Sequence, residues 1–145
     1  MLDQAIKKAV VAAMALHQSI PVIQDIFHIT YIHNTGAAFS MMEGMRSFLI
    51  LLPLVLVLAA VIFIFLKRKT AHPLLLTSIA MIAGGGLGNM IDRIAYGYVV
   101  DFLDFRVFPI FNAADIFVCV GCGLLILYVL VFDGKKDGKR DDLQS

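Results

Sequence analysis

The sequence predicts an all-α membrane protein with four transmembrane helices and a small extracytoplasmic β-rich segment. Of its 145 residues, 60% are hydrophobic and 16% are charged, and the mean hydropathy is +0.87. Soluble domains contain only roughly 45–50% apolar residues, so these values indicate an integral membrane protein. At roughly 20 residues for each span, the chain accommodates four spans in one membrane domain, residues 1–145, and no separate soluble domain.

Four apolar segments supply the predicted helices, and the clearest of them is residues 48–66. Only Pro53 interrupts its apolar character, and membrane helices tolerate proline because their neighbours satisfy the freed backbone groups. The other three predicted spans are residues 3–16, 74–91 and 113–132.

Residues 17–45 differ in character from the spans and form the predicted β-rich segment. They contain several breakers and a stretch, 27–33, in which β-branched and aromatic residues dominate, which is typical of strands. Because open strand edges are costly in hydrocarbon, we expect this segment at the membrane surface. His28 and His33 are interpreted as interfacial polar residues, since no third metal ligand is spaced with them.

The basic residues predict the orientation of the chain. A basic cluster at 67–69 follows the second span, and four further Lys and Arg residues lie in the tail, 133–145. The positive-inside rule assigns both to the cytoplasm, which requires two crossings between them. The N-terminus is then also cytoplasmic, while segment 17–45 and the link 94–112 share the outer face.

Asp101 and Asp115 stand at the two ends of the short link between the last two spans. Both ends of such a link lie at one membrane face, where two carboxylates can share a proton and a water as an acid/base pair. Asn112 and Asp115 also have the spacing of a capping box, and a helix cap alone would account for them. In the catalytic interpretation the helix dipole favours ionised Asp115, which leaves Asp101 protonated.

Two more polar groups occur at apolar helices. Asn89, Asp92 and Arg93 are spaced i, i+3 and i+4 and would line one helix face, as a functional or a structural cluster. Asp3 and Lys7 are spaced i, i+4 and either form an ordinary charged helix start or reach a common partner.

Other motifs point to packing and not to chemistry. The spacing of Gly84 and Gly88 favours close helix contact, because a phosphate loop would need a preceding strand and water around it. Cys119 and Cys122 lie in an apolar run without a further metal ligand, so no zinc or redox site is expected. The net charge of +1 makes nucleic acid an unexpected partner. No metal and no cofactor is expected.

The chain contains four motifs, Asn34-Thr-Gly-Ala-Ala-Phe-Ser40, Gly86-Leu-Gly-Asn-Met-Ile-Asp-Arg93, Val99-Val-Asp-Phe102 and Phe111-Asn-Ala-Ala-Asp115. In this order they resemble the motifs of the bacterial lipoprotein signal peptidases, also called signal peptidase II. The resemblance implies an intramembrane aspartic endopeptidase of the bacterial inner membrane. Such an enzyme cuts the signal peptide from prolipoproteins before a cysteine that carries diacylglycerol.

The resemblance also implies roles for individual residues. Asp101 and Asp115 would be the catalytic pair, and Asp3 and Lys7 fit the D-Q-x-x-K pattern of the family's first helix. The implied partners are the prolipoprotein signal peptide and membrane lipid, and the implied state is a monomer. The residues that would bind substrate or support the pair are Asn34, Asn89, Asp92, Arg93 and Asn112.

Two features depart from the family's pattern. Asp3 lies almost at residue 1, and a helix over 3–16 would be about 21 Å long, shorter than the roughly 30 Å hydrocarbon core. We therefore expect either a truncated start or a first helix that spans the membrane incompletely. The link between Asp101 and Asp115 is also short for the family, which would trim a surface loop over the site.

Two other functions fit a small polytopic protein. A non-enzymatic transport or assembly protein would carry polar residues through the span centres or in paired half-repeats. A lipid transferase would need a basic headgroup site. The predicted span centres are apolar and the polar residues gather at one face, which favours a catalytic site.

Overall fold

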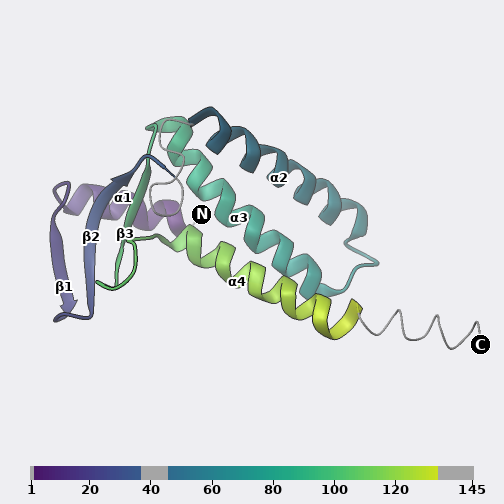
Figure 1. The fold of residues 1–145 in the computed structure, drawn as a ribbon. Coiled ribbons are helices and arrows are strands. Elements are labelled where there is room, and N and C mark those ends of the chain that lie inside the picture. The colour runs from purple at the N-terminus through teal and green to yellow at the C-terminus, as the bar shows by residue number, and fades with distance from the viewer. Residues whose placement is uncertain (1, 37–45, 134–145) are drawn as a thin grey trace, which may run out of the picture.

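The computed structural model of the chain describes residues 2–36 and 46–133. Three long helices lie side by side, and a small sheet with a shorter helix behind it stands at one end of them (Figure 1). In chain order the elements are α1 (Leu2–Ala13), β1 (Ser19–Ile23), β2 (Phe27–Asn34), α2 (Arg46–Lys67), α3 (Pro73–Ala95), β3 (Val99–Asp104), α4 (Ala113–Tyr128) and a π-helical turn, η2 (Val129–Asp133).

Three of the four predicted spans are confirmed as helices that are apolar and long enough to cross a membrane. They are Ser47–Lys67, Pro73–Ala95 and Ala113–Phe132. Local sequence sets their starts: His72 caps α3, with proline at its first position, and Asn112 caps α4 in a full capping box.

The predicted first span is not among the membrane-capable helices of the described residues. α1 has 12 residues, about 18 Å at 1.5 Å per residue, and it lies behind the sheet at the end of the bundle (Figure 1). Its inner face packs on the sheet, where Val10, Tyr31, Val100 and Phe102 form one apolar core. The helix therefore belongs to the sheet end of the molecule, and four transmembrane helices are not confirmed.

The sheet is antiparallel and has the order β1-β2-β3. β1 and β2 confirm the strands expected within residues 17–45. β3 lies in the segment that we interpreted as a link, and it pairs along β2, with Ile32 opposite Asp101 and Asn34 opposite Val99. This pairing brings Asp101 onto a strand beside Asn34.

Glycines bring α3 and α4 into close contact, as predicted, but Gly84 is not one of them. A Cβ on Gly84 would meet nothing within 4 Å. A Cβ on Gly85 would overlap the carbonyl oxygen of Ala114 and lie 2.7 Å from Cγ2 of Val118. A Cβ on Gly88 would lie 3.1 Å from that of Ala114. Gly85 and Gly88, at i and i+3, are the pair that faces α4.

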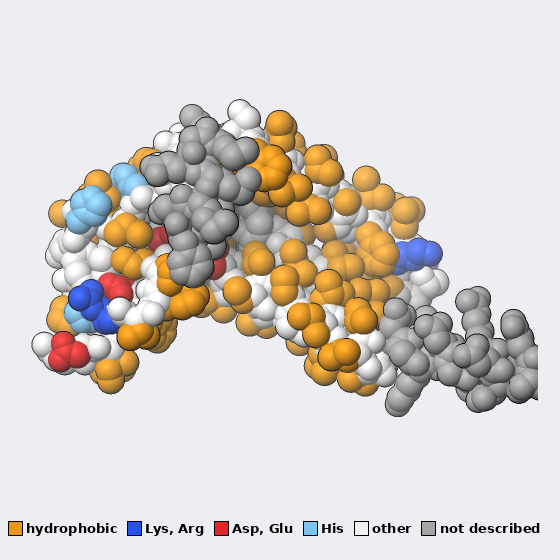
Figure 2. All heavy atoms as spheres, in the orientation of Figure 1, with side chains coloured by type: hydrophobic (Ala, Val, Ile, Leu, Met, Phe, Trp, Pro, Cys, Tyr) orange, Lys and Arg blue, Asp and Glu red, His pale blue; other side chains and the backbone are white. Residues whose placement is uncertain are grey.

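The surface divides as a membrane protein requires. Hydrophobic side chains cover the helices on the face in view, whereas acidic, basic and histidine side chains gather mainly at the sheet end (Figure 2). Large apolar side chains of α2, such as Val55, Ile62 and Phe65, are more than half exposed. At the opposite end of α2, Lys67 and Arg68 are exposed, which agrees with a headgroup position.

Candidate active site

Asp101 lies on β3 at the junction of the sheet and the helices, and only 1% of its surface is exposed. Its Oδ2 accepts a hydrogen bond of 2.9 Å from Nδ2 of Asn34 on β2. Its Oδ1 accepts a hydrogen bond of 2.6 Å from Nδ2 of Asn112, the cap of α4. Two amides from different elements therefore fix both oxygens of this carboxylate.

Asp115 lies in the first turn of α4 and is half-buried. Its Oδ1 accepts a bond of 2.7 Å from Nδ2 of Asn89 on α3. Its Oδ2 accepts a bond of 3.1 Å from the backbone N–H of Asn112, which closes the capping box. The helix cap thus orients the carboxylate as well as stabilising the helix start.

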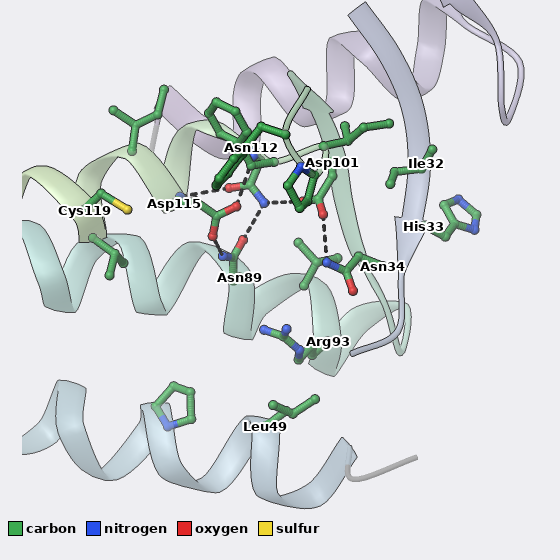
Figure 3. A pocket seen from close by; sticks show the side chains of 18 of the residues that line it. Ile32, His33, Asn34, Leu49, Asn89, Arg93, Asp101, Asn112, Asp115 and Cys119 are labelled. Carbon is green, nitrogen blue, oxygen red and sulfur yellow. Dashed lines mark hydrogen bonds between the residues drawn. The ribbon is translucent and has the colours of Figure 1, made fainter. Parts of the chain in front are cut away.

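Two amides join the carboxylates into one chain of hydrogen bonds. Nδ2 of Asn112, which donates to Asp101, also donates to Oδ1 of Asn89 over 3.0 Å. Figure 3 shows Asn112 and Asn89 lying between Asp101 and Asp115, with Asn34 on the far side of Asp101. The predicted pair therefore occupies one site, although the residues are 14 positions apart in the sequence.

Both carboxylates line a cavity of about 710 Å³, a size typical of ligand sites. Its polar lining consists mainly of the side chains just described together with Arg93. Its apolar walls come chiefly from α2, α4 and the segment after β3, with Leu49, Phe108 and Ile116 among them. A pocket of this kind suits a largely apolar ligand that places one polar bond against the two carboxylates.

The environment of Asp101 favours its protonated form. Burial raises the pKa of Asp101 to about 6, and the negative charge of Asp115 adds to this effect. Hydrogen bonds from Asn34 and Asn112 and the positive charge of Lys7 oppose it without cancelling it. A proton on Asp101 is what a carboxylic acid needs to donate to a substrate oxygen.

A second polar cluster links α1 to the site. The ammonium of Lys7 lies 3.0 Å from Oδ2 of Asp3 and 2.8 Å from Oδ2 of Asp92, with all three side chains nearly fully buried. Asp3 also accepts a bond of 2.9 Å from the backbone N–H of Ala114, in the first turn of α4. The predicted residues Asp3, Lys7 and Asp92 thus come together and dock α1 against α3 and α4.

Arg93 and Asn34 connect the site to Gly36, which follows β2 in the chain. Arg93 donates to the carbonyl oxygen of Gly36 over 2.7 Å, and the N–H of Gly36 donates to Oδ1 of Asn34 over 3.0 Å. The latter bond leaves Nδ2 of Asn34 facing Asp101. The motif segment beyond Gly36, residues 37–40, lies outside the described residues.

Sequence reasoning missed Gln4 and gave no role to the cavity wall. Nε2 of Gln4 donates to Oδ1 of Asp92 over 2.7 Å and to the carbonyl oxygen of Gly88 over 3.0 Å. A neutral amide in a charged helix start carries little signal by itself. Cys119, interpreted as a packing residue, is exposed and lines the cavity. Among the described residues, no group of three or more His, Cys, Asp or Glu side chains could hold a metal ion.

Comparison with known proteins adds independent information. The sequence model of the signal peptidase (SPase) II family matches residues 1–131. A lipoprotein signal peptidase of Halothermothrix orenii is 46% identical over 129 residues, 89% of this chain and 88% of that protein. One of Symbiobacterium thermophilum is 44% identical over 138 residues, 92% and 90% of the two chains. A solved bacterial membrane enzyme is 33% identical, with a TM-score of 0.82, over 89% of this chain and 80% of that one.

Fold, site and structural likeness together define a membrane enzyme built from apolar helices, with a cavity lined by two carboxylates at one end. The chain belongs to the signal peptidase II family. Membership in this family indicates a protease that removes signal peptides from prolipoproteins in a membrane.

Proposed function

We propose that the chain is an intramembrane aspartic endopeptidase, acting as a monomer, that cuts diacylglyceryl-modified prolipoproteins before the lipidated cysteine. The observation that carries this proposal is the pair formed by Asp101 and Asp115. The two carboxylates line one cavity and are joined through Asn112 and Asn89 by hydrogen bonds of 2.6 to 3.0 Å. Two carboxyl groups in different environments can divide the roles of acid and base.

In the proposed mechanism, ionised Asp115 accepts a proton from a water that attacks the scissile carbonyl carbon. Protonated Asp101 donates its proton to the carbonyl oxygen, which gives a neutral tetrahedral intermediate. Asp115 then passes its proton to the leaving nitrogen as the carbon–nitrogen bond breaks. Asp101 takes back the proton of the hydroxyl as the new carboxyl group forms, so the enzyme returns to its starting state.

The raised pKa of Asp101 supports this division of roles. Burial and the neighbouring charge of Asp115 raise the pKa of Asp101 to about 6, so it keeps its proton to a higher pH than an ordinary aspartic acid does. Asp115 lies in the first turn of α4, where the helix dipole stabilises negative charge.

The proposed site faces the extracytoplasmic side of the bacterial inner membrane. The exposed basic residues Lys67 and Arg68 lie at the other end of α2 and would be cytoplasmic, as would the C-terminal tail. The cytoplasmic N-terminus that we predicted gains no support, because Asp3 packs beside Gly88, in the half of α3 nearest the site. The diacylglyceryl chains would lie against the apolar cavity walls and the bilayer.

The direct test uses purified protein in detergent with one prolipoprotein precursor in two forms, with and without diacylglycerol on the cysteine. We expect cleavage of the lipidated form only, and a product that begins with the lipidated cysteine by mass spectrometry. Cleavage elsewhere in the precursor, or equal cleavage of both forms, would contradict the proposed specificity.

A further inference from the structure

Lys7 reaches beyond its ion pairs to the catalytic chain of hydrogen bonds. Its Nζ donates to Oδ1 of Asn89 over 2.9 Å, in addition to its contacts with Asp3 and Asp92. An ammonium group has three donors and no acceptor. Lys7 is only 2% exposed, and among these three partners Asn89 accepts a hydrogen bond while Asp3 and Asp92 form ion pairs with Lys7.

This contact determines which way the side-chain amide of Asn89 faces. Its oxygen accepts from Lys7 over 2.9 Å and from Asn112 over 3.0 Å, and its nitrogen donates to Asp115 over 2.7 Å. In the opposite orientation the nitrogen would meet two donors, and the oxygen would face the carboxylate. The charged ammonium group of Lys7 cannot accept a hydrogen bond, so it excludes that orientation of the Asn89 amide.

The geometry points to Lys7 as a positioning residue that, through Asn89, fixes the hydrogen bond to Asp115 and so supports its role as the base. This inference rests on the proposed function, in which Asp115 accepts a proton from water. A hydrogen bond to an ionised carboxylate stabilises the charged form, and an amide polarised by an ammonium group is a stronger donor.

Net charge alone does not explain the effect. Asp3 on α1 and Asp92 on α3 each contact Lys7, so the buried cluster carries two negative charges and one positive charge. Its summed field does not favour a further negative charge on α4. Arg93 on α3 and Asp101 on β3 are the other charged groups that interact across the site. The structural link from Lys7 to Asp115 is therefore the chain of two hydrogen bonds through Asn89.

The structure offers a charge-matched test. The double variant Lys7→Met, Asp3→Asn leaves one negative charge in the cluster, the same net charge as in the native protein, but removes the donor to Asn89. Asp92 keeps its hydrogen bonds from Gln4 and from the backbone N–H of Val100. The control Asp3→Asn keeps the bond from Lys7 to Asn89, and its amide oxygen can still accept from Ala114.

Two quantities are measured in detergent for the native protein and both variants. The first is the pH dependence of kcat/KM for prolipoprotein cleavage. We expect the acid-side midpoint to rise by about one pH unit in the double variant and to stay in place in Asp3→Asn. The second is the NMR signal of the Asn89 side-chain amide, which should follow acid titration in all three proteins and show the same displaced midpoint in the double variant.

A third measurement needs only the native protein, so it holds even where the double variant does not fold. Nuclear Overhauser contacts from the Asn89 amide protons should reach the β-protons of Asp115. Strong contacts to the ε-protons of Lys7 in their place would overturn the inference, as would an unchanged acid-side midpoint in a folded double variant. A native protein that cleaves no prolipoprotein would refute the proposed function, while the NMR results would still decide the role of Lys7.

Discussion

Asn112 donates to Asp101 through a hydrogen bond of 2.6 Å. The same residue caps α4, and its backbone N–H holds Asp115 in the capping box. One residue thus positions a carboxylate on the sheet with its side chain and a carboxylate on a helix with its backbone N–H, with none of its own surface exposed. The start of α4 and the geometry of the acid/base pair therefore depend on the same residue.

Substitution of Asn112 separates these two tasks. In Asn112→Ser the hydroxyl oxygen can still cap α4, but the side chain is too short to donate to Asp101. In Asn112→Ala both functions are lost. We expect Ala to cost about 1 kcal/mol more stability than Ser. Both should lose roughly tenfold or more in kcat/KM, because a hydrogen bond to a charged or acidic group is lost. Thermal unfolding and cleavage assays measure the two effects, and a fully active Ser variant would contradict this role.

The pKa of Asp101 predicts how stability changes with pH. Burial, the largest cause, raises the pKa of Asp101 from 3.8 to about 6. Between these values the folded state holds a proton that the unfolded state has lost, so stability falls as pH rises. The full effect is about 3 kcal/mol above pH 6. Asp101→Asn cannot ionise, so its thermal midpoint should improve relative to the native protein from pH 4 to pH 7.

An NMR titration of the Asp101 carboxyl carbon provides the matching control. Because the negative charge of Asp115 helps to raise the pKa of Asp101, Asp115→Asn should lower that pKa. The pKa should remain above its ordinary value, since burial is the larger cause. A midpoint that rises in Asp115→Asn would show that the two carboxylates do not interact as described.

The glycines of α3 predict opposite effects for two neighbouring substitutions. Gly85→Ala would force a Cβ into Ala114 and Val118 of α4, whereas Gly84→Ala meets nothing within 4 Å. We expect Gly85→Ala to lower the thermal midpoint and the activity, because α4 carries Asp115. Gly84→Ala should be neutral or stabilise the helix by up to about 1 kcal/mol. Equal behaviour of the two variants would contradict the α3–α4 contact.

Gln4 predicts a loss of stability without a change in chemistry. In the native protein Gln4 donates to the carbonyl oxygen of Gly88 and to Oδ1 of Asp92, and Gln4→Leu removes both hydrogen bonds. The expected cost is about 1–3 kcal/mol. Because Gln4 contacts neither catalytic carboxylate, activity per folded molecule should change less than about threefold. Lys8→Gln, at an exposed position of the same helix, is the control and should leave stability nearly unchanged.

Much of the architecture could be predicted because apolar runs and their end signals are local. The three long helices agree with the predicted spans to within a few residues. The strand β3 could not be predicted from the same information, because it pairs with β2 far away in the sequence. The position of α1 was missed for a related reason: its apolar face packs on the sheet, which the helix pattern does not distinguish from contact with lipid.

The site was predictable as a set of residues but not as a set of contacts. Motif resemblance and spacing both selected Asp101 and Asp115. They could not indicate that Asn89 and Asn112 bridge the two carboxylates, because the bridge depends on how α3, α4 and β3 meet in space. The structure brings all nine predicted site residues into one connected region, and their catalytic roles remain predictions.

The central claim is that Asp101 and Asp115 act together as acid and base. The most direct measurement is the rate of prolipoprotein cleavage by Asp101→Asn and Asp115→Asn at equal folded amounts. Asp104→Asn is the matched control, since Asp104 is a buried carboxylate on the same strand that accepts from Thr30 and Arg106 outside the cavity. We expect a loss of about a hundredfold or more in each catalytic variant and near-native cleavage in the control. Cleavage within about threefold of the native rate by either catalytic variant, well below the factor that acid/base catalysis supplies, would contradict the account.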